Sequence, residues 1–413
     1  MKRPIQLLLV VLLIASCNNN RNNYLVGELK KVGSDSLPSY KVNTKDIYSL
    51  SIPDELSVVT TQSLVKDYKL IRLETNDSCL ISRISNLLQD DEYFFILDAA
   101  GEVFAFDTEG KFLHRFGEKG KGPGEHLAYH SISIDSKQKV LYALDFRLKK
   151  IFLFDYSGRL IKEKPTEICA SNFAYSYDYL FFETSFQPNT RNAIIDLNQL
   201  VLTDSNLQPR YCAFPYSQQV RAGMYATRKN NALKQFGDSM YFCNVLSPDT
   251  LWRFYNHELK AVYSLAYSGR QSELTDIEIL DWEENRRSGK APSRLFGVVL
   301  TGDYICFKIS NEQHELYPLF LSNKTKQIKY VRSINIDTEM PIRLIDLMGS
   351  INPEYSFGST SFIDIWEPST INRFKVQWDQ RLIDKITQIE KEMLSSFQDT
   401  DNPVLVVFTL HDF

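Results

Sequence analysis

The chain has 413 residues, of which 43% are hydrophobic, 13% aromatic and 24% charged, so it has ample material for a large core. This composition excludes disordered, collagen-like and disulfide-knot proteins. The net charge of −4 argues against a nucleic-acid partner, because dedicated nucleic-acid binders normally carry a strong basic excess.

Residues 1–17 have the pattern of a bacterial lipoprotein signal peptide. Lys2 and Arg3 precede an apolar run from Ile5 to Ile14, which is too short to span a bilayer. The run ends in Leu13-Ile14-Ala15-Ser16-Cys17, which resembles a lipobox and implies that Cys17 carries a lipid that anchors the protein in a membrane. Asn18 follows the cysteine, and by resemblance to the usual sorting rule this favours an outer-membrane lipoprotein on the periplasmic or cell-surface side. An ordinary secretory signal with a coincidental cysteine is the alternative.

Residues 18–44 are polar and aperiodic, which predicts a flexible tether between this anchor and a folded body over residues 45–413. Five cysteines follow Cys17, and an odd number in an exported chain cannot all pair within one molecule. Cys243 and Cys306 lie in apolar runs, where a thiol behaves as a small hydrophobe. We therefore expect buried free thiols rather than a disulfide framework.

A repeat of about 48 residues organises the body. Residues 93–107 and 140–155 each contain two short runs rich in aromatic and β-branched residues, and each is followed by an Asp-x-x-Gly turn. The turns at Asp107 and Asp155 are 48 residues apart, and weaker copies follow near Asp204, Tyr255 and Ser322. About four strands per repeat indicate the blade of a β-propeller.

The spacing predicts an all-β, six-bladed propeller, with seven blades as the main alternative. A ring must close or leave sticky edges exposed. We expect the segment Tyr68–Glu74 to complete the last blade beside the strongly apolar segment Asn402–Leu410.

Two helices are expected between the strands. A capping box at Thr275–Glu278 begins a helical insertion that Gly289 ends. A second, long helix near the C-terminus is predicted over residues 373–397 by one apolar face. That face consists of Trp378, Leu382, Ile386, Ile389, Met393 and Phe397. We expect it to pack against the flank of the propeller.

A family resemblance rests on several of these features together. They are the lipobox, the Leu73-Glu74-Thr75 segment, the repeated Phe-Asp-x-x-Gly, the loop Phe116–Glu125 and the closing Asn402-Pro-Val-Leu. This set resembles the six-bladed β-propeller lipoproteins common in Bacteroidetes, which are related in style to NHL-repeat propellers. The resemblance covers residues 45–413 and implies an extracytoplasmic propeller, without a catalytic residue set that transfers to this chain.

The glycine-rich loop and the nearby histidines favour structural roles. Gly122 is followed by Pro123 and Gly124, so the Gly-Lys-Ser/Thr of a phosphate-binding loop is lacking. His126 and His130 have a spacing that would align two metal ligands on a helix, but their segment reads as the start of a strand. We expect no cofactor, no metal and no catalytic triad.

The topology of a blade predicts which face carries a ligand. The connections between blades and the loops between second and third strands emerge on one face, and in this chain they are the long ones. We expect this face to be the functional one. Its candidate ligand-binding residues are Glu125, His126, Arg147, Lys149, Arg191, Arg221, Tyr225, Arg228, Lys229, Trp282, Arg286 and Arg287. Several are cations that would attract anionic sugars or an acidic protein surface.

These observations favour a non-catalytic recognition or scaffold module of the cell envelope with a glycan or an envelope protein as its partner. The rival hypothesis is a metal-dependent hydrolase or lyase with its site in the central funnel, which requires Asp, Glu, Asn or His side chains from several blades to converge. A subunit of a polysaccharide-uptake system is a third reading, which rests on family habit alone.

Overall fold

The computed structural model describes residues 30–31, 47–52, 58–90, 92–224, 232–243, 250–267, 294–310, 316–333, 339–347, 351–377 and 380–413. Its strands form six antiparallel sheets arranged as the blades of a β-propeller. Blade 1 consists of β5 (Ile84–Asp90), β6 (Tyr93–Asp98), β7 (Val103–Asp107) and β8 (Phe112–Arg115). Blade 2 consists of β11 (Ser131–Asp135), β12 (Val140–Asp145), β13 (Lys150–Asp155) and β14 (Leu160–Pro165). Blade 3 consists of β15 (Asn172–Ser176), β16 (Tyr179–Glu183), β17 (Asn198–Thr203) and β18 (Pro209–Pro215).

Blade 4 consists of β19 (Leu233–Phe236), β20 (Ser239–Cys243), β21 (Thr250–Tyr255) and β22 (Glu258–Tyr267). Blade 5 consists of β23 (Arg294–Leu300), β24 (Tyr304–Ser310), β25 (Leu316–Ser322) and β26 (Ile328–Ser333). Blade 6 joins both ends of the propeller, in the order β27 (Tyr355–Phe357), β28 (Ser361–Trp366), β29 (Val404–Leu410) and β4 (Val65–Arg72). The first strand of each blade contacts the first strands of both neighbours, so β5, β11, β15, β19, β23 and β27 form a closed inner ring.

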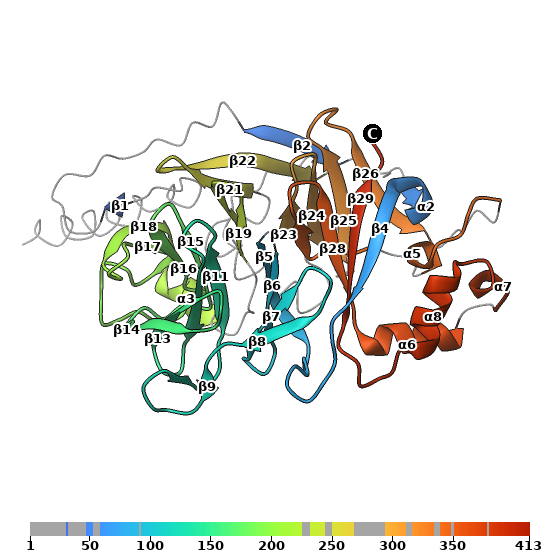
Figure 1. Ribbon diagram of the computed structural model, residues 1–413. Coiled ribbons are helices and arrows are strands. Elements are labelled where there is room, and N and C mark those ends of the chain that lie inside the picture. The colour runs from blue at the N-terminus through green and yellow to red at the C-terminus, as the bar shows by residue number, and fades with distance from the viewer. Residues whose placement is uncertain are drawn as a thin grey trace, which may run out of the picture.

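The predicted closure of the ring is present. β4 pairs antiparallel with β29 from Val404–Arg72 to Leu410–Val65, and Figure 1 shows the blue β4 beside the red β29. This pairing covers an edge of β29 that would otherwise be open to another chain. The six blades predicted from the repeat are therefore confirmed.

A belt of three short strands precedes β4. We call β1 (Lys30–Lys31), β2 (Tyr48–Ile52) and β3 (Val58–Thr60) the N-terminal belt. They pair in turn with β18, β22 and β26, the outermost strands of blades 3, 4 and 5. The belt therefore shields the outer edges of these blades in the same way that β4 completes blade 6.

The repeated turns form as expected. Asp107 Oδ1 accepts hydrogen bonds from the backbone N–H of Glu109 and Lys111 at 3.0 and 2.8 Å. Gly110 has a φ of +87°, and a Cβ there would lie 2.2 Å from the carbonyl oxygen of Arg72. Only glycine fits this turn, because it needs positive φ and sits directly against β4.

The long helix predicted near the C-terminus is divided into three shorter helices. They are α6 (Pro368–Gln377), α7 (Gln380–Ile383) and α8 (Gln388–Ser396). Thr387 begins α8 with a capping box, in which its hydroxyl accepts from Glu390 N–H and Glu390 returns a bond to Thr387 N–H. This new start shifts the apolar face, so Ile389 is 79% exposed while Met393 and Phe397 are buried.

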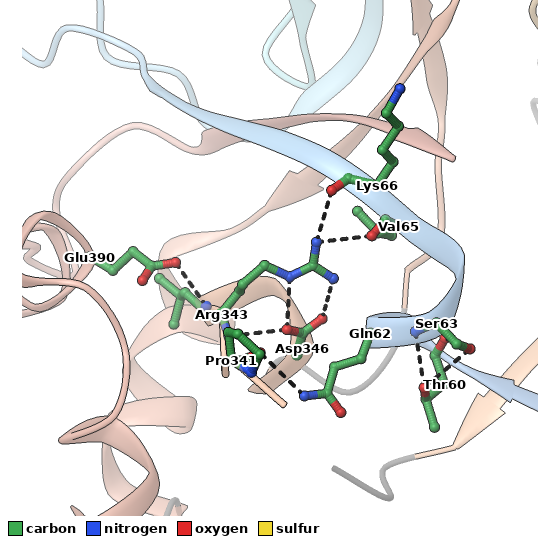
Figure 2. A network of polar contacts seen from close by, with 10 residues as sticks. Thr60, Gln62, Ser63, Val65, Lys66, Pro341, Arg343, Asp346 and Glu390 are labelled. Atoms are coloured by element: carbon green, nitrogen blue, oxygen red, sulfur yellow. Dashed lines mark hydrogen bonds and ion pairs between the residues drawn. The ribbon is translucent and has the colours of Figure 1, made fainter. Parts of the chain in front are cut away.

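Two further short helices fasten this helical region to the start of the propeller. α2 (Thr61–Leu64) precedes β4, and α5 (Leu344–Leu347) lies between blades 5 and 6. Figure 2 shows Arg343 bound to Asp346 through two nitrogens, at 2.9 and 2.8 Å, and to the carbonyl oxygens of Val65 and Lys66 at 2.9 and 3.2 Å. Arg343 therefore holds the chain before blade 6 against the start of β4 by hydrogen bonds, in addition to the strand pairing of β4 with β29.

The predicted helical insertion and most of the predicted N-terminal anchor and tether lie outside the described residues. The helical insertion at residues 275–289 falls on residues that the structure does not describe, as do Cys17 and most of the predicted tether. The described helices include none that is long and apolar enough to cross a membrane.

Candidate functional site

A cavity of about 690 Å³ lies on the propeller axis. All six inner strands or the turns that follow them line it, from Asn86 in blade 1 to Ser359 in blade 6. The lining residues run along the inner strands, from first residues such as Asn172 and Leu233 to the turns that lead into the second strands. We call the side of the propeller that carries these turns the turn face, and the side with the blade connections the loop face.

The lining of the axial cavity combines polar and aromatic side chains with aliphatic ones, which are Leu87, Leu88, Ile132, Ile134, Ala174, Leu233, Val299 and Leu300. Its hydroxyl and amide groups belong to Ser133, Ser136, Ser176, Ser356, Ser359, Asn86, Gln89, Gln138, Asn172 and Gln235, and its aromatic rings to Phe173, Tyr175, Tyr177, Phe236 and Tyr355. Four carboxylates, Asp135, Asp178, Asp238 and Glu354, face two lysines, Lys137 and Lys234. The cavity therefore offers many hydrogen-bond donors and acceptors, several apolar ring faces and an excess of negative charge.

Hydrogen bonds between blades fix the wall of this cavity. Ser133 Oγ accepts from the backbone N–H of Tyr175 at 2.8 Å, which joins the inner strands of blades 2 and 3. Gln89 Oε1 accepts from Gly358 N–H at 3.0 Å, which joins the turns of blades 1 and 6. The cavity is thus built on packed strands rather than on mobile loops, which favours a pre-formed site.

Tyr175 forms a polar and aromatic cluster in the wall. Its ring stacks on Tyr142 with a centroid distance of 5.1 Å, and its hydroxyl donates to Asp178 Oδ1 at 3.1 Å. Burial, together with the negative charge of Asp135, raises the pKa of Tyr175 above its usual value. The phenol is therefore a neutral hydrogen-bonding group throughout the physiological pH range.

Lys234 is a half-buried cation in the wall of blade 4. Its Nζ lies 4.8 Å from the ring centroid of Tyr355 and 3.5 Å from the carbonyl oxygen of Glu354, both in blade 6. Burial and the positive charge of Lys308 lower the pKa of Lys234 to about 8. Lys234 thus reaches across blade 5 and joins two walls of the axial cavity.

Two smaller hollows adjoin the axial cavity on the turn face. One of about 230 Å³, which we call the side hollow, shares Phe236 and Leu300 with the axial cavity. The other, of about 340 Å³, shares Tyr177 and Asp178 with it and extends over blades 3 and 4 towards His257. The depressions on the turn face therefore form one branched surface.

The two predicted candidates in the glycine-rich loop have structural contacts on the loop face. Glu125 Oε2 accepts from Gly122 N–H at 2.8 Å, and a Cβ on Gly120 would lie 1.8 Å from this oxygen. His126 is fully buried, its ring stacks on Tyr129 at 3.9 Å, and its Nε2 lies 3.8 Å from Glu102.

Glu102 is the charged centre of this buried group. Burial would raise the pKa of Glu102, but the nearby imidazole of His126 and the ammonium of Lys119 outweigh it and lower the pKa to about 2. Lys119 Nζ lies 2.7 Å from Glu102 Oε1. These contacts hold the blade connection in place.

The predicted cations of the loop face have different surroundings. Arg221 in α3 (Gln218–Met224) pairs with Asp196 at 2.8 Å, and both side chains are mostly buried. Arg191 is exposed and lies 3.9 Å from Glu167. Arg147 and Lys149 are exposed on the turn between β12 and β13. The remaining candidates, Tyr225, Arg228, Lys229, Trp282, Arg286 and Arg287, lie outside the described residues.

None of the described candidates lines the axial cavity or either adjoining hollow. The sequence carries one signal that points to the cavity instead. In Ser131-Ile132-Ser133-Ile134-Asp135, small polar residues alternate with apolar ones that pack between blades. Such alternation in the first strand of a blade indicates a polar wall on the propeller axis.

In the described part of the chain, the cysteines are unpaired and the carboxylates are not clustered. Cys79, Cys169, Cys212, Cys243 and Cys306 are all free thiols, as predicted; Cys79, Cys212 and Cys306 are buried, whereas Cys169 and Cys243, the latter predicted to be buried, are half-buried. Among the described residues, no three His, Cys, Asp or Glu side chains are grouped so that they could hold a metal ion. The carboxylates of the axial cavity are therefore spread around its wall.

Comparisons with known proteins agree with this fold. The model of a family described as a domain of unknown function, DUF4934, matches residues 48–409, and the chain belongs to this family. The crystal structure of a Bacteroides fragilis protein classed as exported is similar, with a TM-score of 0.67 and 16% identity over 89% of this chain and 100% of that one. A DUF4221 family member from Bacteroides vulgatus has a TM-score of 0.44 and 8% identity over 84% of this chain and 98% of that one. No curated protein matches the sequence.

Proposed function

We propose that this protein is a lipid-anchored, non-catalytic recognition module of the cell envelope that binds a glycan in its axial cavity. The observation that carries the proposal is the cavity of about 690 Å³ to which all six blades contribute. This volume lies within the range of about 300–1,000 Å³ that is usual for small-molecule sites.

The chemistry of the wall supports a sugar rather than an apolar ligand. Sugar hydroxyls both donate and accept hydrogen bonds, and five of the six blades supply hydroxyls, amides or carboxylates to the wall, whereas blade 5 supplies Val299 and Leu300. The partly exposed rings of Tyr175 and Tyr177 provide faces for the C–H surfaces of a pyranose.

The N-terminal sequence supports the location of the module. The lipobox ending at Cys17 and the asparagine after it favour an outer-membrane lipoprotein on the periplasmic or cell-surface side. The similar Bacteroides fragilis protein is classed as exported, which agrees with a position outside the cytoplasm. A recognition module in this position would meet glycans before they enter the cell.

The proposal is tested with two matched glutamine variants of the full chain. Gln235 is exposed on the turn face and lines the axial cavity, whereas Gln219 is exposed on α3 of the loop face. Binding of neutral and acidic oligosaccharides is measured by calorimetry. We expect Gln235→Trp to fill the mouth of the cavity and weaken binding about tenfold or more, or at least 1.4 kcal/mol.

Gln219→Trp serves as the control and is expected to bind like the unmodified protein. The reverse result, with binding lost only in Gln219→Trp, would place the ligand on the loop face and overturn the axial site. If no oligosaccharide of either class binds, the glycan proposal fails.

A further inference from the structure

The side hollow differs from the axial cavity in the charge of its wall. It is lined by Tyr48 of the N-terminal belt, by residues of blades 4 and 5, and by two cations, Arg253 and Lys326. Its other described lining residues are Phe236, Tyr241, Val262, Tyr263, Leu300, Thr301, Gly302, Ile305 and Asn323. None of these is a carboxylate, so the hollow is positively charged beside a cavity whose wall is mainly acidic.

Neither cation is neutralised by an acidic side chain within the described part of the chain. The Nε of Arg253 is buried without a hydrogen-bond acceptor, and its guanidinium lies 5.4 Å from the ring centroid of Tyr255. Lys326 is exposed on the turn after β25, with its Nζ 5.6 Å from the ring centroid of Tyr48. A buried donor without an acceptor carries a desolvation cost that a bound anion would remove.

The aromatic side chains place these two cations around one space. Tyr48 packs edge-to-face on Tyr263 with a centroid distance of 5.7 Å. Burial raises the pKa of Tyr263, and the positive charge of the nearby Arg253 opposes this rise. Both cations carry N–H donors for which an anion is an acceptor. Arginine in particular matches the planar fork of a carboxylate or the oxygens of a sulfate.

From these contacts we infer that the side hollow binds an anionic group of the ligand in the axial cavity, so that the ligand is an acidic oligosaccharide carrying carboxylate or sulfate. This inference rests on the proposed function, because Phe236 and Leu300 are shared by both spaces and one chain of sugars would occupy both. The four carboxylates of the axial cavity repel the acidic residue, while Arg253 and Lys326 attract it. The charge difference therefore orients the ligand, with its acidic group in the side hollow.

The test compares ligands that differ only in charge. Trigalacturonate and its methyl ester have the same sugar backbone, and a sulfated chondroitin disaccharide shows whether sulfate substitutes for carboxylate. We expect the acid to bind the full-length protein about tenfold or more tightly than the ester, with an affinity that falls as salt rises. Equal affinities for acid and ester would overturn the inference.

Two variants locate this preference in the side hollow. Lys326→Gln and Arg253→Gln should each reduce the affinity for the acid towards that of the ester and leave the affinity for the ester unchanged. If Arg253→Gln lowers the stability of the protein, Lys326→Gln still decides the test, because Lys326 is exposed on a turn. Lys111→Gln removes the same charge from the exposed turn after β7 in blade 1, outside every hollow described above, and should have no effect.

The outcomes separate this inference from the proposed function. If acid and ester bind equally and Gln235→Trp abolishes both, the axial glycan site stands and the anion site is wrong. If the acid is preferred but Lys111→Gln removes the preference as fully as Lys326→Gln does, the attraction is a general surface effect and the inference also fails. If trigalacturonate, its ester and the sulfated disaccharide all fail to bind but a neutral oligosaccharide binds, the inference fails and the axial glycan site stands. If no oligosaccharide binds, the proposed function and the inference fail together.

Discussion

Replacing Asn402 with alanine should be among the most destabilising single changes in this protein. Asn402 is 2% exposed and lies two residues before the start of the closing strand β29 at Val404. Its Oδ1 accepts from Ile81 N–H at 2.8 Å, and its Nδ2 donates to the carbonyl oxygens of Glu74 and Cys79, both at 2.6 Å. One side chain therefore holds the segment between blade 6 and blade 1 against the end of the chain.

Asn402→Ala leaves three backbone groups of this segment without their partners. A buried group that loses its hydrogen bond costs about 1–3 kcal/mol, and partial relaxation makes the sum smaller than three separate losses, so we expect about 3–5 kcal/mol. The free energy of unfolding is measured by urea titration with circular dichroism. Asn76→Ala is the matched control, because Asn76 is exposed in the same segment and should lose less than about 1 kcal/mol.

The comparison of these two asparagines decides the prediction. A loss of less than about 1 kcal/mol for Asn402→Ala would show that the segment does not depend on this side chain. An equal loss for both variants would show that the general cost of removing an amide, and not its place at the closure, sets the effect.

Three further variants test other parts of the structure by the same urea titration. Arg343→Lys should destabilise by about 1–3 kcal/mol, since lysine cannot bind both oxygens of Asp346 and also reach Val65 and Lys66; an unchanged stability would contradict this. Arg221→Gln should lower the free energy of unfolding by about 1–2 kcal/mol, because it removes the ion pair with Asp196, and should leave glycan affinity unchanged. A loss of affinity at unchanged stability would instead support the loop face as the binding face. Burial raises the pKa of Asp364 from 3.8 to about 6, so its contribution to stability is complete below about pH 4 and falls as pH rises through 6, by about 3 kcal/mol at most. Relative to Asp364→Asn, the unmodified protein should therefore lose stability between pH 4 and about 7, and a constant difference would refute this.

The propeller could be predicted because its determinants are local and repeated. Each blade carries the same short apolar runs, and Asp107 and Asp155 fix equivalent turns 48 residues apart. Closure followed from the need to cover the free edge of β29, and the early segment at β4 covers it. Physical requirements that apply to every blade were therefore enough to give the ring.

The N-terminal belt and the broken helix could not be predicted in the same way. Lys30–Lys31 and Val58–Thr60 are too short to show a strand period, and their pairing depends on the distant strands β18 and β26. The apolar spacing from Leu382 to Phe397 suits one helix, but the capping box at Thr387 restarts it and leaves Ile389 exposed. In the belt, pairing with distant strands decides the structure, and in the helical region the cap at Thr387 interrupts the apolar helical periodicity.

The location of the candidate site shows why loop length alone is a weak guide in this fold. Long connections identify where a chain can vary, and several of those on the loop face are occupied by their own contacts, such as Glu125 with Gly122 and Arg221 with Asp196. The axial cavity needs no long loop, because six inner strands already converge on the axis and any small polar residue there opens space. A hollow made in this way has walls fixed by strand pairing, as Ser133 and Tyr175 show, so a bound ligand orders little of the protein. The turn face is therefore the better location for a rigid recognition site, and the contrast between Gln235→Trp and Gln219→Trp tests that conclusion directly.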